Sequence, residues 1–141
     1  MPLLHELPEA VLELLEKPRV AVLATVRADG TPATTACWYG LQDGMILLTV
    51  YANARRLPNI RRRAHVALTI LDEDPYRHVS VSGPVARMWE DPEMEVMNLL
   101  SMRYTGEPWH EREPCVSMLV EIERWHAYGV LSDGSDHGPA S

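Results

Sequence analysis

The sequence predicts a mainly β domain with short helices, folded as a six-stranded antiparallel barrel. Short segments rich in valine and threonine recur along the chain, and turn residues separate them at intervals of roughly ten positions. The spacers between these segments also leave little room for the helical crossovers of a parallel sheet. The length of 141 residues fits one domain, and a hydrophobic content of 46% is sufficient for a core.

The N-terminal part predicts one short helix before the first strand. Residues 6–17 place Pro8 where a first helical turn tolerates proline, and Val11 and Leu15 follow at helical spacing. Pro18 ends the pattern. The segment is therefore expected to form an amphipathic helix.

Three strands follow this helix and are expected to pair as an antiparallel meander. Two Asp-Gly pairs, at positions 29–30 and 43–44, have the composition of tight reversals. The strands on either side of them are predicted at residues 19–27, 31–40 and 45–50.

Two more helices are expected in the second half of the chain. Pro58 is tolerated only in a first helical turn, because deeper inside a helix it removes a hydrogen bond and clashes with the preceding turn. A short helix therefore begins near Leu57. Asp91 is expected to cap a longer helix that starts with Pro92 and ends near Arg103.

Three further strands complete the predicted barrel. Gly83-Pro84 predicts a bulge or bend within the second of them. Residues 1–131 are expected to form a single domain, and residues 132–141 form a polar tail that is expected to be disordered. The three strands are predicted at residues 64–71, 77–87 and 115–123.

Composition restricts the partners and the location of the protein. A net charge of −7 has the wrong sign for a protein whose main partner is a nucleic acid. No apolar run reaches the roughly 18 residues that a membrane helix needs, and the N-terminus lacks the layout of a secretion signal. We therefore expect a cytoplasmic protein that binds neither nucleic acid nor membrane.

Cysteine and histidine spacing predicts neither a disulfide framework nor a metal site. Cys37 and Cys115 are the only cysteines, and they are too far apart in sequence for a CxxC motif. The six histidines show no paired spacing of the kind that binds metal ions. Both thiols are expected to be small buried hydrophobic groups.

Five arginines within nine positions stand out in this acidic chain. Arg55 and Arg56 precede the predicted helix, where cations oppose the helix dipole at a cost of roughly 0.3–1 kcal/mol each unless an anion compensates. Two readings stay open for this pair, a phosphate site and surface ion pairs with acidic residues of a neighbouring element. The remaining arginines, at positions 61–63, lie at the other end of the helix, where the dipole favours them without a ligand.

Four segments, in this order, resemble the pyridoxamine 5′-phosphate oxidase-like split-barrel family. They are most similar to the branch of that family whose members use FMN or the deazaflavin coenzyme F420. The resemblance implies a six-stranded split barrel and a homodimer, with the cofactor in the groove between the two subunits. The four segments are residues 22–40, 47–70, 74–88 and 99–109.

The resemblance also implies which residues bind the cofactor. Arginines and an asparagine at the start of the short helix meet its phosphate, residues of the second strand face its ring, and an aromatic residue near the C-terminus reaches the cofactor of the partner subunit. Carried over by motif, these residues are Arg55, Arg56, Asn59, Thr35, Trp38, Thr49, Ala52 and Trp125. Trp38 and Tyr39 are adjacent in a strand and face opposite sides, so one belongs to the core while the other is free to cover a flat ring.

The function implied by the resemblance is that of an FMN- or F420-dependent oxidoreductase, a flavoprotein-like enzyme that transfers hydride or electrons to a small organic substrate. Solvent or Tyr76 would supply a proton, and the loop over residues 103–109 would shape the substrate site. An alternative stays open because the chain shows no catalytic constellation. In that alternative the same fold stores flavin or binds haem without turnover, with His78 or His126 as the axial ligand of the haem.

Overall fold

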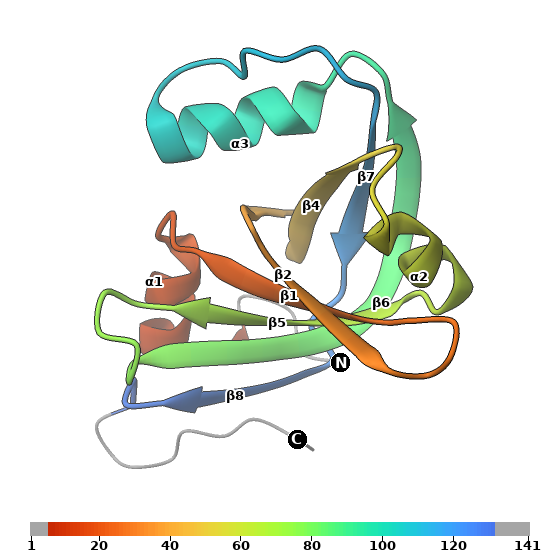
Figure 1. Cartoon of the computed structure of the whole chain (residues 1–141). Coiled ribbons are helices and arrows are strands. Elements are labelled where there is room, and N and C mark those ends of the chain that lie inside the picture. Colours follow the sequence, from red (N-terminus) through yellow and green to blue (C-terminus); the bar gives the residue numbers. More distant parts are fainter. Residues whose placement is uncertain (1–5, 132–141) are drawn as a thin grey trace.

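The computed structural model describes residues 6–131, which contain eight strands and three helices (Figure 1). The polar tail expected at residues 132–141 lies outside the described residues. The helices are α1 (Glu9–Glu16), α2 (Arg56–Arg62) and α3 (Glu95–Thr105). The strands are β1 (Ala21–Val26), β2 (Pro32–Cys37), β3 (Gly40–Gln42), β4 (Met45–Tyr51), β5 (His65–Leu71), β6 (His78–Asp91), β7 (Cys115–Val120) and β8 (Arg124–Tyr128).

The eight strands form one antiparallel sheet in the order β2-β1-β5-β6-β7-β4-β3, with β8 paired to β6. The mainly β, antiparallel class is therefore confirmed, but the predicted number of six strands is wrong. The path of pairing runs from β2 to β3, and within residues 6–131 no pairing joins these two ends into a closed ring. Figure 1 shows how β6 curves so that its first half belongs to one side of the molecule and its second half to the other.

The predicted meander of three strands is also wrong. The segment expected as one strand over residues 31–40 divides into β2, which pairs with β1, and β3, which pairs with β4. The ladder breaks at Trp38 and Tyr39, where the Tyr39 N–H donates to the Tyr104 hydroxyl instead of to a neighbouring strand. Because β4 pairs with the distant β7, the two hairpins lie in different halves of the sheet.

Strand β8 was not predicted as a separate element. It is short, and only residues 121–123 separate it from β7. Its burial alternates, with Trp125 and Ala127 inside and Arg124, His126 and Tyr128 outside, as expected for a strand with one wet face. No Gly, Pro or Asn marks the connection from β7, so the usual signal of a turn is missing.

The bend in β6 lies close to the predicted place. Its register against β7 shifts between Val85 and Arg87, rather than at Gly83-Pro84. Gly83 has a different reason to be glycine, because a Cβ atom there would lie 1.8 Å from the backbone oxygen of Glu121. The close approach of the β7–β8 connection therefore requires a residue without a side chain.

Both predicted helix starts in the second half need correction. Helix α2 begins at Arg56, and Arg55 already has helical φ and ψ angles of −62° and −29°. Arg56 thus belongs to the first turn instead of preceding it, and Pro58 is the third helical residue, where its missing N–H is still tolerated. Helix α3 begins at Glu95, because Met94 adopts a left-handed conformation with φ of 58°.

Asp91 nevertheless caps α3. Its carboxylate accepts hydrogen bonds from the backbone N–H groups of Glu95 and Val96, both at 3.0 Å, and from the Ser117 hydroxyl at 2.9 Å. Asp91 is buried, so these bonds connect the start of α3 firmly to β7. The cap fixes the helix that covers the cavity described in the next subsection.

The first helix is confirmed, and it covers one end of the main core. Its buried residues are Val11, Leu14 and Leu15. A smaller apolar cluster holds α3 against β4 and β7 through Leu47, Val96, Leu100 and Leu119. Among residues 6–131, no helix is long and apolar enough to cross a membrane.

Candidate functional site

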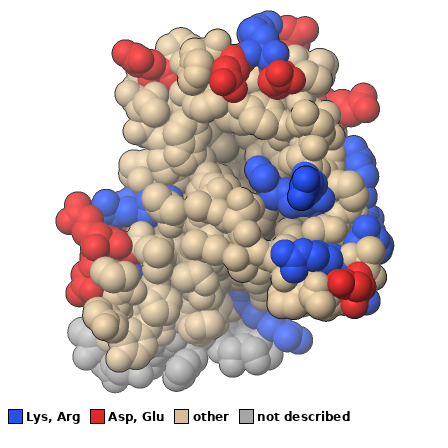
Figure 2. All heavy atoms as spheres, viewed as in Figure 1, with Lys and Arg blue, Asp and Glu red and all other residues tan. Residues whose placement is uncertain are grey.

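A cavity of about 340 Å³ lies between α3, β2, β4 and the start of α2. Its volume is within the range of small-molecule sites, which begins at roughly 300 Å³. Figure 2 shows the recess beneath α3, with basic side chains gathered to its right, over α2. The cavity is lined by Val20, Ala36, Cys37, Trp38, Thr49, Tyr51, Arg56, Met97, Leu100 and Trp109.

Two tryptophans form the aromatic part of the cavity wall. Trp38 stacks on Tyr104 with ring centroids 5.0 Å apart and planes 13° apart, and Trp109 meets Trp38 edge to face at 5.6 Å. These contacts fix the orientation of the Trp38 ring. Tyr39 is fully buried in the core and Trp38 lines the cavity, although neither residue lies in the strand expected there. The arrangement offers a flat, apolar ligand a rigid aromatic surface.

Arg56 is the cation of the cavity. Its Nε atom is buried and has no hydrogen-bond partner, and none of the ion pairs among residues 6–131 involves its guanidinium. A buried N–H group without an acceptor costs roughly 1–3 kcal/mol. A bound anion would remove this cost, and the planar guanidinium suits the oxygens of a phosphate or carboxylate.

Tyr51 and Trp109 connect the cavity to the solvent-exposed loop after α3. The Trp109 Nε1–H donates to the Tyr51 hydroxyl at 3.0 Å, and that hydroxyl donates to Oε2 of Glu111 at 3.2 Å. The Trp109 backbone N–H donates to Oδ1 of Asn98 at 3.0 Å, which ties the loop to α3. Burial is the main cause that raises the pKa of Tyr51, so its phenol stays protonated at neutral pH.

Two further polar side chains line the cavity, and neither is activated. Burial raises the pKa of Cys37 to about 11, although the nearby Arg56 charge acts in the opposite direction. The thiol is therefore unreactive at neutral pH. The Thr49 hydroxyl oxygen lies 2.9 Å from the Ser117 hydroxyl oxygen and 3.5 Å from the Val116 carbonyl oxygen, so β7 holds it in place.

The structure brings three of the eight predicted cofactor-binding residues together at this cavity, Trp38, Thr49 and Arg56. Thr35 shares a face of β2 with Cys37, two residues from the lining. Arg55 is exposed and does not contribute to the lining.

The other predicted residues do not contribute to the lining. Ala52 is exposed, and its N–H donates to the Pro114 carbonyl at 2.8 Å. The Asn59 amide donates to the Thr25 hydroxyl at 3.4 Å. Trp125 is buried beside a second cavity, and Tyr76 is 73% exposed on the β5–β6 loop.

Several lining residues were not predicted as site residues. Tyr51 ends β4, and Met97 and Leu100 lie on α3. Cys37 follows the β2 alternation two residues from Thr35, and that period-2 spacing was the available signal. Trp109 belongs to the segment over residues 103–109 that was expected to be a loop shaping a substrate site, although residues 103–105 form the end of α3.

The second cavity, of about 230 Å³, opens on the outer face of the sheet between β5, β6 and β8. It brings His126 and Trp125 together with Arg124, Ser80 and Ser82. His78 lies outside both cavities; its ring stacks on Tyr128 at 5.8 Å and its Nδ1 lies 3.0 Å from the Pro75 carbonyl. Within residues 6–131, no three side chains of His, Cys, Asp and Glu gather as metal ligands would.

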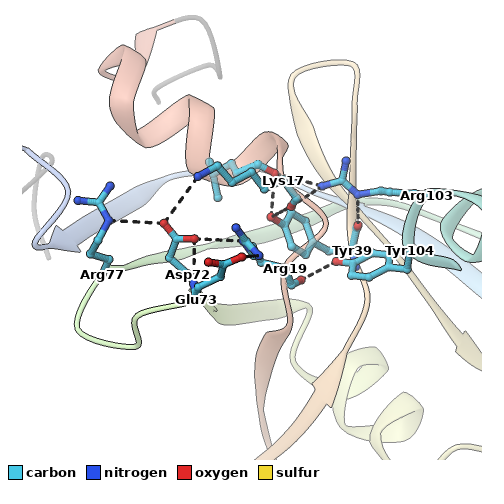
Figure 3. Close-up of polar contacts among 9 residues, drawn as sticks. Lys17, Arg19, Tyr39, Asp72, Glu73, Arg77, Arg103 and Tyr104 are labelled. Atoms are coloured by element: carbon cyan, nitrogen blue, oxygen red, sulfur yellow. Dashed lines mark hydrogen bonds and ion pairs between the residues drawn. The ribbon is translucent and has the colours of Figure 1, made fainter.

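A network of paired cations lies beside the cavity (Figure 3). Arg19 Nε is 3.1 Å from Oδ1 of Asp72, and Lys17 Nζ and Arg77 Nε approach Oδ2 of the same carboxylate at 3.7 and 3.5 Å. These contacts hold the β5–β6 loop against the segment between α1 and β1. All three cations have a carboxylate partner, unlike Arg56.

Arg103, also drawn in Figure 3, closes the end of α1. Its guanidinium donates to the carbonyl groups of Tyr39, Glu16, Leu15 and Lys17 at 2.9–3.3 Å. The last carbonyls of a helix lack intrahelical partners and carry the negative end of its dipole, so a cation is stabilising there. Arg103 is therefore a structural residue.

Comparison with known proteins gives one family and several similar structures. A family model described as pyridoxamine 5′-phosphate oxidase matches residues 7–129. None of the curated proteins compared with the chain matches it. Among solved structures, an F420 reductase superimposes with a TM-score of 0.77 at 31% identity, over 84% of this chain and 98% of the reductase.

Two mycobacterial structures are also similar. A conserved hypothetical protein from Mycobacterium tuberculosis has a TM-score of 0.73 and 28% identity, over 96% of this chain and 92% of its own. A heme binding protein from Mycobacterium smegmatis has a TM-score of 0.62 and 20% identity, over 89% of this chain and 56% of its own. The similarity to the heme binding protein shows a shared fold alone.

Proposed function

We propose a redox function for this chain because it belongs to the pyridoxamine 5′-phosphate oxidase family. In this proposal the chain is an oxidoreductase that binds FMN or F420 and reduces a small organic substrate. Similarity at 31% identity to an F420 reductase supports the deazaflavin, and the family supports a flavin, so both cofactors stay in the proposal. The residues that line the cavity are the ones to substitute in a test of this proposal.

The observation that carries the proposal is the unpaired Nε of Arg56 in an aromatic-walled cavity. The phosphate of either cofactor would accept from Arg56, and exposed Arg55 beside it would add a second positive charge. Trp38, fixed by Tyr104, would contact the flat ring system. When bound and reduced, such a cofactor supplies a hydride or electrons, while the protein supplies position and electrostatics.

A homodimer is part of the same proposal. The outer face of β1, β5 and β6 carries small side chains in register, because Ala24 pairs with Ala67 and Ala67 with Ser82. Such a flat, half-buried face can pack closely against another sheet. Val20, which lines the cavity, is 53% exposed, so one wall of the cavity faces outwards. A second copy packed on this side would cover that wall.

Titration of the purified protein with FMN and with F420 tests the proposal. We expect at least one of them to bind with a dissociation constant below about 100 μM, which corresponds to roughly −5.5 kcal/mol. The absorption spectrum and mass of any molecule that co-purifies would identify the cofactor directly. Failure of both cofactors to bind in this range would overturn the proposal.

Turnover separates an enzyme from a storage protein. With the reduced cofactor in excess, an enzyme reduces at least one member of a panel of quinones, nitro compounds and enones. A storage protein binds the cofactor and reduces none of them. Sedimentation analysis of the same sample tests the dimer, and a monomer that binds and turns over would contradict the shared site.

A further inference from the structure

We propose that Tyr51 donates the proton that completes substrate reduction, and that Glu111 restores it from solvent. This inference rests on the redox function proposed above. Transfer of a hydride adds one hydrogen and an electron pair, so a neutral product also needs one proton. The ten residues that line the cavity can be compared as sources of that proton.

Tyr51 is the lining residue whose exchangeable hydrogen has a route to water. Arg56 is assigned to the cofactor phosphate in the proposed function. The Thr49 hydroxyl contacts Ser117 and Val116, which are both buried. For the Cys37 thiol, burial raises the pKa to about 11, and the described residues offer it no hydrogen bond that leads out of the cavity.

The contacts of Tyr51 have the geometry of a short relay. Its hydroxyl donates to Oε2 of Glu111 at 3.2 Å, and the Glu111 side chain is 55% exposed to solvent. The Trp109 Nε1–H donates to the same hydroxyl oxygen at 3.0 Å. That N–H would stabilise the tyrosinate formed after proton donation, because a hydrogen bond to the charged form favours it.

For an enone substrate, the proposed step adds one hydride and one proton across the C=C bond. The β-carbon receives a hydride from the reduced cofactor, and the electron pair of the C=C bond moves to form an enolate. The O–H bond of Tyr51 breaks and a C–H bond forms at the α-carbon, which gives the saturated ketone and a tyrosinate. Before this transfer, rotation of the Tyr51 hydroxyl about its C–O bond turns the hydrogen from Glu111 to the cavity. A proton from water then passes through Glu111 to the tyrosinate.

Titratable neighbours surround Tyr51 on several elements. Glu111 lies on the loop after α3 and has His110 beside it, with Nε2 3.7 Å from Oε1. Cys115 at the start of β7 pairs with Tyr51 in the sheet, and Arg56 lines the same cavity. Burial raises the pKa of Tyr51, and Glu111 raises it further, whereas the bond from Trp109 lowers it.

The kinetic test compares Tyr51→Phe with Tyr128→Phe in the cofactor-loaded protein, with cyclohexenone as the acceptor. Tyr128 is 59% exposed on β8 and does not line the main cavity, so it serves as the matched control. We expect kcat of Tyr51→Phe to fall by about 100-fold or more, in the range of general acid catalysis. The dissociation constant of the cofactor should change by less than about twofold, since the ring of Tyr51 is kept.

A second readout needs neither cofactor nor turnover. The pKa of Tyr51 can be followed by NMR with tyrosine labelled at Cζ, with Tyr51→Phe to assign the signal. Glu111→Gln should lower this pKa, because it removes a negative charge, and Trp109→Phe should raise it, because it removes a hydrogen bond to the tyrosinate. Unchanged pKa values in both variants would overturn the relay.

The outcomes also separate this inference from the proposed function. A wild-type protein that binds no cofactor or reduces no acceptor would overturn the redox function and the proton-donor role together. A wild-type enzyme with a fully active Tyr51→Phe variant would overturn the proton-donor role alone. If Tyr51→Phe loses both cofactor binding and turnover, Tyr51 is a binding residue and the proton-donor role is overturned. An equal fall in kcat for Tyr76→Phe would make that exposed tyrosine a competing proton donor. This result would also contradict the assignment of Tyr51.

Discussion

Arg56 and Arg103 are both half-buried arginines, and their surroundings give them opposite roles. Arg103 donates to four backbone carbonyls and lies over the ring of Tyr39 at 5.2 Å. Arg56 faces a cavity, and its buried Nε has no partner. A buried guanidinium N–H without an acceptor raises the free energy of the folded state. A ligand that accepts a hydrogen bond from this N–H removes that cost. The comparison separates a structural cation from a binding one.

The strongest test of the structural side is Arg103→Ala. The substitution removes one donor from the carbonyls of Leu15, Glu16, Lys17 and Tyr39, and the Tyr39 hydroxyl continues to donate to those of Leu15 and Lys17. We expect the free energy of unfolding to fall by about 3 kcal/mol, since a single hydrogen bond from a charged donor contributes roughly 1.5–3 kcal/mol and water replaces part of the loss. Urea denaturation measures this change. Arg103→Lys should recover only part of it, because an ammonium group lacks the planar fork. A loss below about 1 kcal/mol would mean that the carbonyls are satisfied by water.

Tyr39→Phe probes the same junction with a smaller change. The Tyr39 hydroxyl donates to the carbonyls of Leu15 and Lys17 at 2.8 and 3.0 Å, and its ring is fully buried. Phenylalanine keeps the packing and removes the hydrogen bond, which should cost about 1 kcal/mol in thermal or chemical unfolding. Cofactor affinity should not change, because Tyr39 faces away from the cavity. A large loss of affinity would show that the two regions are not independent.

The smallest effect is expected at Asp72, and it depends on pH. The hydrogen bond from the Glu73 N–H, together with Lys17, Arg19 and Arg77, holds the pKa of this carboxyl below its ordinary value of 3.8. A lowered folded-state pKa means that the contribution to stability is present above pH 3.8 and is lost as the pH falls through the folded-state pKa. Asp72→Asn should therefore flatten the acid limb of the melting-temperature profile. If the melting temperatures of the wild type and of Asp72→Asn fall in parallel as the pH is lowered, the Asp72 ion pairs do not contribute to stability as described.

Local signals predicted the elements of this fold better than their pairing. Both Asp-Gly turns are present, with positive φ at Gly30, Asp43 and Gly44. The partner of β4, by contrast, is β7, and no local pattern indicates that these two distant strands pair. The number and order of strands therefore depend on contacts between segments far apart in sequence.

The sequence also predicted part of the candidate site and missed the rest. Arg56, Trp38 and Thr49 came from a run of arginines and from family motifs, and all three line the cavity. Tyr51 was not predicted as a site residue, because its role depends on contacts with Trp109 and Glu111, which lie about sixty residues away in the sequence. The family assignment itself, made from four ordered motifs, is confirmed.

The most direct test of the central claim is cofactor binding by Arg56→Ala, with Arg63→Ala as its control. Both substitutions remove one arginine from the same short helix region, but Arg63 is exposed at the helix end and does not line the cavity. We expect Arg56→Ala to weaken binding of FMN or F420 at least about tenfold, or roughly 1.4 kcal/mol, while the unfolding midpoint of the empty protein stays within error. Arg63→Ala should bind like the wild type. Equal affinity in all three proteins would contradict the account, because the unpaired guanidinium would then not be the phosphate site.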